Sequence, residues 1–244
     1  MFFNLYTFES ELRDEVIMKS ALVILLLLVT IPFATLSQSN SPQSPVEIKG
    51  EAHHHPKFEN ELVRIWDVTV PAGDATLWHV HRNDNVVITL AGANLRLENA
   101  SGPPVEAQWK FGEVRFAKAT YTHRAINIGT TPFRNLTIEL LKPANENPPV
   151  LAKQGDREPV LENDRMRVFR LSLQPGESTP VHTHPLPGLA VAITAGELET
   201  TAEGGKPQRV ELAAAEVRWR PGAVTHSIKN VGKTPFEAVD IELK

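Results

Sequence analysis

The sequence contains no cysteine among its 244 residues. Disulfides, thiolate metal sites and thiol nucleophiles are therefore excluded, because each of them needs a cysteine sulfur. Any metal ion must be held by His, Asp, Glu or Asn side chains. The fold must also depend on the burial of apolar side chains, without covalent cross-links.

An excess of basic residues is missing as well. Lys and Arg number 25 against 29 Asp and Glu, which gives a formal net charge of -4, and no basic cluster stands out. Binding to nucleic acid or to an anionic membrane surface is therefore not expected. The hydrophobic fraction of 41% is ordinary for a globular protein. We expect a folded protein whose partner is a small molecule.

A long apolar run occurs only near the N-terminus. After Met18 and Lys19 come the apolar residues 21–31 and then small and polar residues, which is the order of a secretory signal peptide. The run is shorter than the about 20 residues that span a bilayer. We predict a signal peptide over residues 1–37, translation from Met18, and a secreted or periplasmic protein without stable membrane association. An uncleaved anchor is the alternative.

Two stretches of the sequence recur at one fixed offset. Residues 58–73, "FENELVRIWDVTVPAG", resemble residues 161–176, and residues 127–140, "NIGTTPFRNLTIEL", resemble residues 230–243. In both pairs the second copy starts 103 residues after the first, at 161 instead of 58 and at 230 instead of 127. A repeat at this period indicates two homologous domains. We place them at residues 56–147 and 148–244, after a flexible Ser/Pro-rich linker over residues 38–55.

Each copy consists of short β-forming runs separated by Gly and Pro, and no long stretch has the period of a helix. This pattern predicts an all-β fold, two tandem barrels or jelly rolls. The predicted strands of the first copy cover residues 62–70, 86–90, 95–98, 114–116, 124–128 and 133–140. Those of the second copy cover residues 166–173, 189–194, 196–200, 210–212, 216–219 and 236–243.

Six of the nine histidines obey the same offset. They form a His-x-His pair and a later histidine in each copy, namely His79, His81 and His123 in the first and His182, His184 and His226 in the second. Residues two apart on a strand point to the same face, so each pair presents two imidazoles to one space. Imidazole is the commonest metal ligand. The pattern predicts a three-histidine site for a divalent metal in each copy, with metal-free hydrogen-bonded histidines as the alternative.

The segments around these histidines resemble the two sequence motifs of the cupin superfamily. "GDATLWHVHRNDNVVITLAG" and "GESTPVHTHPLPGLAVAITAG" resemble the first motif, and "GEVRFAKATYTHRAIN" and "AEVRWRPGAVTHSIKN" resemble the second. The resemblance covers residues 56–244, and the doubled arrangement is similar to a bicupin. It implies two cupin-type barrels of the double-stranded β-helix type, each with a metal site.

The sequence departs from the cupin motif at the glutamate that usually completes the ligand set. Counted back from the closing glycine, this position falls on Asn85 in the first copy and on Leu189 in the second. Leucine cannot ligate, so we expect three histidines with open positions in the second copy and a possible fourth ligand, Asn85, in the first. An ion without a carboxylate ligand favours an anionic or chelating substrate. The identity of the metal ion stays open among Fe, Mn, Zn, Ni and Cu.

Three functions remain open at this point. The first is a metal-dependent enzyme of the oxygenase, dioxygenase or isomerase type, the second a non-catalytic protein that binds metal or a small ligand, and the third a structural protein whose barrels pair through sheet edges. We expect a monomer or homodimer. The histidines at 53–55 form a short tract that could capture metal, but in a tether they are expected to be solvated. Trp78, Trp109, Arg124, Trp219 and Arg220 are candidates for substrate contact at the mouth of a barrel. The favoured alternative is that Trp109 and Trp219 pack in the core or at its rim and that the arginines are solvated.

Overall fold

The structure is a computed structural model that describes residues 44–144 and 158–244. The predicted signal peptide and the first residues of the predicted linker lie outside the described residues. Residues 42–244 belong to one compact unit. Within the described ranges, no helix has the length and apolar character needed to cross a membrane.

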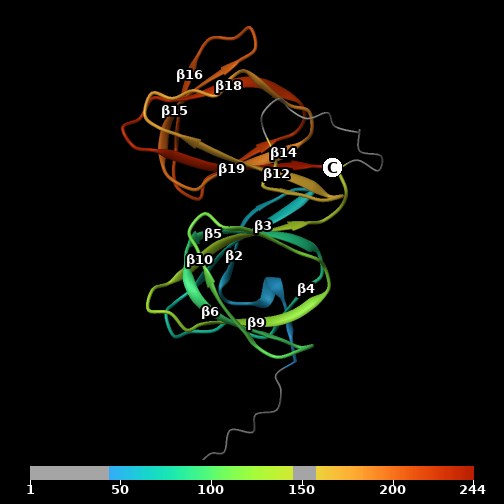
Figure 1. Ribbon diagram of the computed structural model, residues 1–244. Helices are drawn as coiled ribbons and strands as arrows, with labels where there is room; N and C mark the ends of the chain where they lie inside the picture. The colour runs from blue at the N-terminus through green and yellow to red at the C-terminus, as the bar shows by residue number, and fades with distance from the viewer. Residues whose placement is uncertain (1–43, 145–157) are drawn as a thin grey trace, which may run out of the picture. The chain divides into compact units, whose positions relative to one another are not determined.

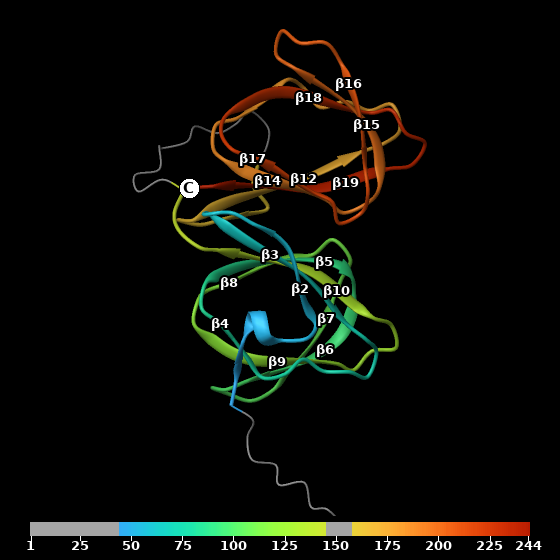
Figure 2. The same ribbon diagram turned by 180° about the vertical axis from the view of Figure 1, so that it is seen from behind.

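The first repeat folds into two five-stranded sheets that form a barrel (Figure 1). One sheet has the order β1 (Val46–Glu47), β4 (His79–His81), β9 (Tyr121–Asn127), β6 (Ala93–Asn99), β7 (Val105–Trp109). The other has the order β2 (His54–Glu59), β3 (Val63–Val70), β10 (Phe133–Leu140), β5 (Asp84–Ala91), β8 (Val114–Ala117). A single 3-10 turn, η1 (Ile48–Gly50), connects β1 with β2 and lies beside β4 (Figure 2).

The second repeat has the same arrangement, with one strand fewer among its described residues. A five-stranded sheet has the order β11 (Leu161–Glu162), β12 (Met166–Leu173), β19 (Phe236–Leu243), β14 (Gly188–Ala192), β17 (Val217–Arg220). A four-stranded sheet has the order β13 (His182–His184), β18 (Val224–Asn230), β15 (Gly196–Ala202), β16 (Gln208–Leu212). The predicted all-β fold with two tandem barrels is confirmed.

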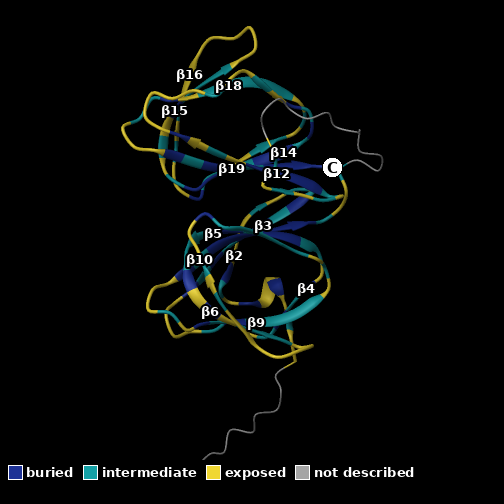
Figure 3. Cartoon of the chain, in the orientation of Figure 1, coloured by how far each residue is buried: buried dark blue, intermediate teal, exposed yellow. Residues whose placement is uncertain are grey.

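The largest apolar core is shared by the two repeats. Along β10, Leu136 and Ile138 belong to this core, whereas Asn135 and Thr137 point to the barrel interior. The same alternation on β19 places Val239 in the core. Figure 3 shows buried segments, in dark blue, along β3, β12 and β14. Because successive strand residues face opposite sides, one sheet of each barrel buries its outer face here while its inner face lines the barrel.

The expected linker is ordered over the part that the structure describes. Within it, β1 pairs in parallel with β4, and Ile48 packs into a second core cluster with Trp66 and Val68. Glu51 and His54 are buried, at 2% and 7% exposure. The expectation of a flexible tether and solvated histidines is therefore wrong for residues 46–54. The Ser/Pro-rich composition did not indicate this order, because the segment is held by the Ile48 side chain and by the pairing of β1 with β4.

We predict that Leu136→Ala lowers the free energy of unfolding by about 2–5 kcal/mol, because Leu136 is fully buried in the shared core. Urea unfolding measures the change. Val105→Ala is the control, since Val105 lies on a strand but is 53% exposed, and its expected cost is below about 1 kcal/mol. Equal losses in the two variants would contradict the assignment of this core.

Candidate metal centres

Strand register brings the third histidine of each repeat to the other two. β4 and β9 pair antiparallel with His79 opposite His123, and β13 and β18 pair with His182 opposite His226. Side chains directly opposite on paired strands lie within contact distance on one face. The histidines predicted from the sequence spacing therefore come together in each barrel.

The N-terminal cluster has its ring nitrogens within contact distance. The Nε2 atom of His79 lies 3.0 Å from that of His81 and 3.1 Å from that of His123. On the other side of the ring, His79 Nδ1 donates to the Leu77 carbonyl at 2.8 Å. A neutral imidazole that donates through Nδ1 carries its lone pair on Nε2. The lone pair of His79 is thus directed at the centre of the cluster.

Burial keeps the N-terminal histidines neutral. Desolvation, with the neighbouring His54, lowers the pKa of His79 to about 4, and desolvation with His79 lowers the pKa of His123 to about 3. The pKa of His81 is also lowered, first by burial and then by His123 and His79. A metal ligand must be deprotonated, so these imidazoles are ready to bind an ion at neutral pH.

The C-terminal cluster joins its three histidines to two carboxylates. One ring nitrogen each from His182, His184 and His226 lies within 4.8 Å of the others. His184 Nδ1 donates to Glu242 at 3.0 Å and lies 3.3 Å from Asp240. Burial alone would lower the pKa of His184, but the hydrogen bonds to Asp240 and Glu242 outweigh it and raise that pKa. Carboxylates in this position fix the tautomer of a metal-bound histidine.

A buried nitrogen without a partner supports the fit of an ion to the C-terminal cluster. His226 Nε2 is buried without a hydrogen-bond partner among the described residues, which is costly unless something else binds it. Nitrogens bound to one ion at about 2.0–2.1 Å lie about 2.9–3.4 Å from one another. The 3.0 and 3.1 Å separations around His79 agree with this range. Both donor sets fit a divalent transition metal.

Asn85 and its neighbour Asp84 take different directions. The Asn85 amide nitrogen donates to the Tyr121 hydroxyl at 3.1 Å and to the Asn83 carbonyl at 3.3 Å. Asp84 accepts from the Ala119 amide at 2.7 Å and from Arg165 at 3.2 Å. Strand alternation turns Asp84 away from the histidines. Asn85 is engaged by Tyr121, whose ring stacks on His81 at a centroid distance of 4.6 Å.

The assignment of Leu189 to the ligand position is wrong. Asn85 pairs with Glu139 on β10, and the residue that pairs with the corresponding Glu242 on β19 is Gly188. Leu189 faces the core shared by the two repeats and is fully buried there. The error arose because the second copy has one more residue before its closing glycine. The C-terminal centre therefore has a glycine, without a side chain, at this position.

Each barrel encloses a cavity next to its cluster. The C-terminal cavity has a volume of about 450 Å³ and the N-terminal cavity about 320 Å³. Tyr121, opposite His81, is replaced by the smaller Val224 opposite His184. Trp219 and Arg220 line the C-terminal cavity and Trp109 the N-terminal one. The C-terminal histidines thus face the larger space.

The expectations for these aromatic and basic residues hold only in part. Trp78 and Arg124 pack on each other, with the guanidinium 5.6 Å from the ring centroid. Trp109, Trp219 and Arg220 line the cavities, and Trp109 and Trp219 also pack against apolar core clusters as expected. Arg220 also donates to Asp240 at 2.9 Å. Their position in the barrel follows from strand pairing across the sheet, which sequence spacing does not reveal.

Three residues of these centres were not identified from the sequence. His54 lies against the N-terminal histidines, with one ring nitrogen within 4.8 Å of nitrogens of His79 and His81. Asp240 and Glu242 lie beside His184. The repeat offset would have indicated Glu242, because Glu139 stands 103 residues earlier. No offset indicates His54 or Asp240, since Arg157 and Thr137 occupy the corresponding positions.

The motif asparagines have a structural role instead. Asn127 and Asn230 are fully buried, and each donates to two backbone carbonyls and accepts from the glycine two residues later. The motif glycines Gly73 and Gly176 have φ values of 77° and 81°, where a side chain would be strained. These repeated residues hold the turns that lead into β4 and β13.

Comparisons with known proteins agree with this architecture. A family model described as "Cupin domain" matches residues 169–242. AerE from Microcystis aeruginosa is similar in structure, with a TM-score of 0.55 and 14% identity over 82% of this chain and 98% of that chain. Oxalate decarboxylase from Bacillus subtilis gives a TM-score of 0.52 and 13% identity over 78% and 74%. At these identities the likeness concerns the fold.

Sequence similarity is higher for one shorter protein. A cupin domain from Bordetella pertussis Tohama I is 30% identical over 36% of this chain and 90% of its own length, with a TM-score of 0.34. No curated protein matches the chain. The family model shows that the second repeat belongs to the cupin superfamily, and the first repeat shares its motifs and its arrangement of paired β-sheets.

Proposed function

We propose that the protein binds a divalent metal ion in each barrel and uses the C-terminal ion to bind and transform a small anionic or chelating molecule. The observation that carries this proposal is the convergence of His182, His184 and His226 beside a cavity of about 450 Å³. Three protein ligands leave coordination positions for a substrate, as catalytic metal sites do. A bound ion would polarise a substrate oxygen as a Lewis acid.

The charges around the C-terminal centre favour an anion. Asp240 is paired with Arg220 at 2.9 Å, and Glu242 is paired with Arg167. These two carboxylates and two guanidinium groups cancel in charge, and the three histidines are counted as neutral ligands. A divalent ion would therefore keep its positive charge uncompensated. A carboxylate or another anionic chelating group on the substrate would balance that charge.

The side chains of the cavity would position such a substrate. The walls include Leu198, Ile228 and Phe236, which exclude water from the space next to the histidines. Asp240 and Glu242 hold the proton of His184 on Nδ1, so that Nε2 keeps the lone pair for the ion. Arg220, held by Asp240 and lining the same cavity, provides a cation near the binding space.

Related structures support a metal-dependent function without defining the reaction. One similar structure, with a TM-score of 0.53, is that of an oxalate decarboxylase with Mn(II) centres. That chemistry belongs to that protein, and it makes small carboxylic acids the first class to test here. The proposal keeps Fe, Mn, Zn, Ni and Cu as candidate ions, and a monomer or homodimer as the assembly.

Export forms a separate part of the proposal. It is supported by the order of residues 18–37, in which Lys19 precedes an apolar run and then small and polar residues. These residues lie outside the part that the structure describes. A secreted or periplasmic protein would meet its metal and its small-molecule substrate outside the cytoplasm.

We predict a metal content near two ions per chain for protein produced without a histidine tag. His79→Ala should remove the N-terminal ion and His182→Ala the C-terminal ion, because each substitution deletes one of the converging imidazoles. Elemental analysis after reconstitution with each candidate metal measures the content. Thr225→Ala, opposite Thr183 in the same sheet, is the control and should keep both ions. Protein that stays free of metal after reconstitution would contradict the proposal.

We predict that small carboxylates bind at the C-terminal ion. In His79→Ala protein loaded with metal, calorimetry should detect binding of a short mono- or dicarboxylate, and in His182→Ala protein the binding should disappear. Binding that survives the loss of His182 would place the anion site elsewhere. The acids that bind are then tested for turnover by oxygen uptake and by release of carbon dioxide. Binding without turnover of any of them would favour a binding protein over an enzyme.

A further inference from the structure

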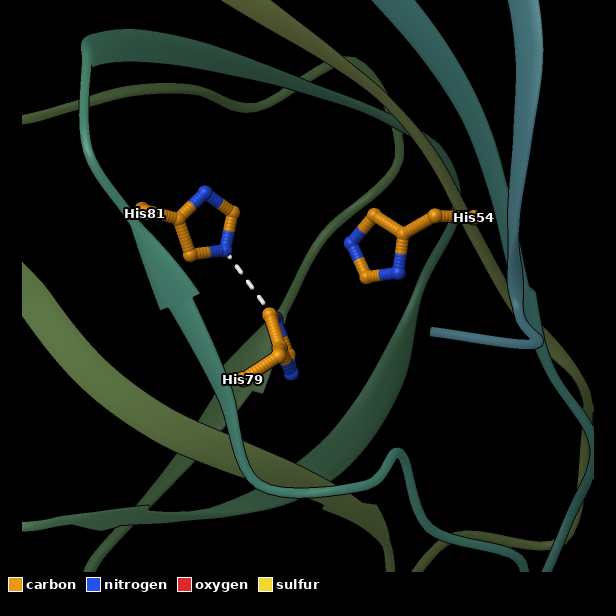
Figure 4. Close-up of side chains that lie close together, drawn as sticks. All are labelled: His54, His79 and His81. Atoms are coloured by element: carbon orange, nitrogen blue, oxygen red, sulfur yellow. Dashed lines mark hydrogen bonds between the residues drawn. The ribbon is translucent and has the colours of Figure 1, made fainter. Parts of the chain in front are cut away.

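The N-terminal barrel contains a fourth histidine that no motif of the sequence indicated. His54 begins β2, which pairs with β3 at an edge of the sheet, and its side chain is 4% exposed. Figure 4 shows the ring of His54 pointing toward those of His79 and His81. The ring centroids lie 4.9 Å from His79 and 6.1 Å from His81. The segment before the barrel thus reaches the metal centre.

A buried carboxylate fixes the orientation of this ring. His54 Nδ1 donates to Glu51 at 2.6 Å, and Glu51 also accepts from the backbone amides of His53 and Leu77. Because the Glu51 carboxylate can only accept this hydrogen bond, it keeps the His54 proton on Nδ1. The lone pair is then on Nε2, the ring nitrogen that lies away from Glu51.

The neighbouring histidines do not share this position. His53 is held by Glu51 at 3.0 Å and by Asp74 at 3.2 Å through its two ring nitrogens. His55 is exposed and lies beside Lys57 and Asp67 on the other face of β2. Strand alternation separates His54 from His55, and only His54 faces the cluster.

We infer that His54 is the fourth imidazole ligand of the N-terminal metal ion, and that the Glu51 carboxylate completes the site through His54. The inference rests on the proposed function, since it requires an ion in this barrel. His54 then has the role of fourth ligand that was expected for Asn85, because the Asn85 amide is hydrogen-bonded to Tyr121. The ligand set lacks a carboxylate, and the Glu51 carboxylate acts on it indirectly, through its hydrogen bond to His54.

The two centres then differ in the chemistry they support. The C-terminal repeat has Gln154 and Arg157 at the positions of Glu51 and His54, and an arginine cannot ligate. Its carboxylates, Asp240 and Glu242, act on His184 instead. His54 would hold the N-terminal ion together with His79, His81 and His123, next to the Tyr121 ring stacked on His81, which would leave fewer positions for substrate. We expect it to exchange more slowly than the C-terminal ion and to prefer metals that favour nitrogen ligands, such as Zn, Cu and Ni.

The test isolates the N-terminal site by placing His182→Ala and His226→Ala in every protein. Zn(II) affinity is measured by competition with a chromophoric chelator, and the Co(II) absorption spectrum reports the ligand set. His54→Gln is compared with the matched control His55→Gln. Glutamine keeps a side-chain N–H that can donate to Glu51 but lacks the imidazole nitrogen, so a purely structural role of His54 would be preserved.

We expect Glu51→Gln to weaken Zn(II) binding by about 10–100-fold, as loss of an outer-shell carboxylate does. His54→Gln should weaken it at least as much and change the Co(II) spectrum, while His55→Gln leaves both unchanged. Affinity and spectrum of His54→Gln equal to those of the parent would overturn the assignment but leave the three-histidine site intact. A parent that binds no ion would overturn the proposed function of this barrel as well.

Circular dichroism of each metal-free variant shows whether it folds. If His54→Gln does not fold, Glu51→Gln decides the question. Loss of affinity in that folded variant supports the ligand role, and unchanged affinity overturns it.

Discussion

The pairing of a three-residue strand with a later strand is the constraint on which both candidate centres depend. β4 and β13 are too short to be stable alone, and their register against β9 and β18 places His79 opposite His123 and His182 opposite His226. A shift of one residue would turn every side chain to the other face. Gly73 and Gly176, with left-handed backbone conformations, and the buried Asn127 and Asn230 fix the turns before these strands.

The same alternation that directs the histidines inward also builds the shared core of the two repeats. On β14, Ala190 and Ala192 line the C-terminal cavity while Leu189 and Val191 enter that core. One face of this strand therefore lines the cavity, and its other face packs into the core that stabilises the fold. Small side chains on the inner face leave room for a ligand, and large apolar ones on the outer face supply the buried area that a chain without disulfides requires.

Much of the architecture was predictable because the sequence contains an internal repeat. The offset of 103 residues identified the domains and all six motif histidines. Counting back from the closing glycine of the motif was less reliable. The second copy has one extra residue before that glycine, so the count gave Leu189 instead of Gly188. The strand β7 was missed because it is short and mostly exposed, although Val105, Ala107 and Trp109 alternate with polar residues. His54 was missed because the residue 103 positions later is Arg157 and because its segment looks like a linker in composition.

The two barrels thus carry the same three histidines but surround them differently. In one, Glu51 orients an additional histidine and Tyr121 covers the cluster; in the other, Asp240 and Glu242 orient His184 beside the larger cavity. The central claim is that both clusters hold metal. Anomalous diffraction from crystals grown with Co(II) tests it most directly. The account predicts one strong peak among His79, His81 and His123 and another among His182, His184 and His226. Cobalt peaks confined to surface carboxylates, with neither cluster occupied, would contradict it.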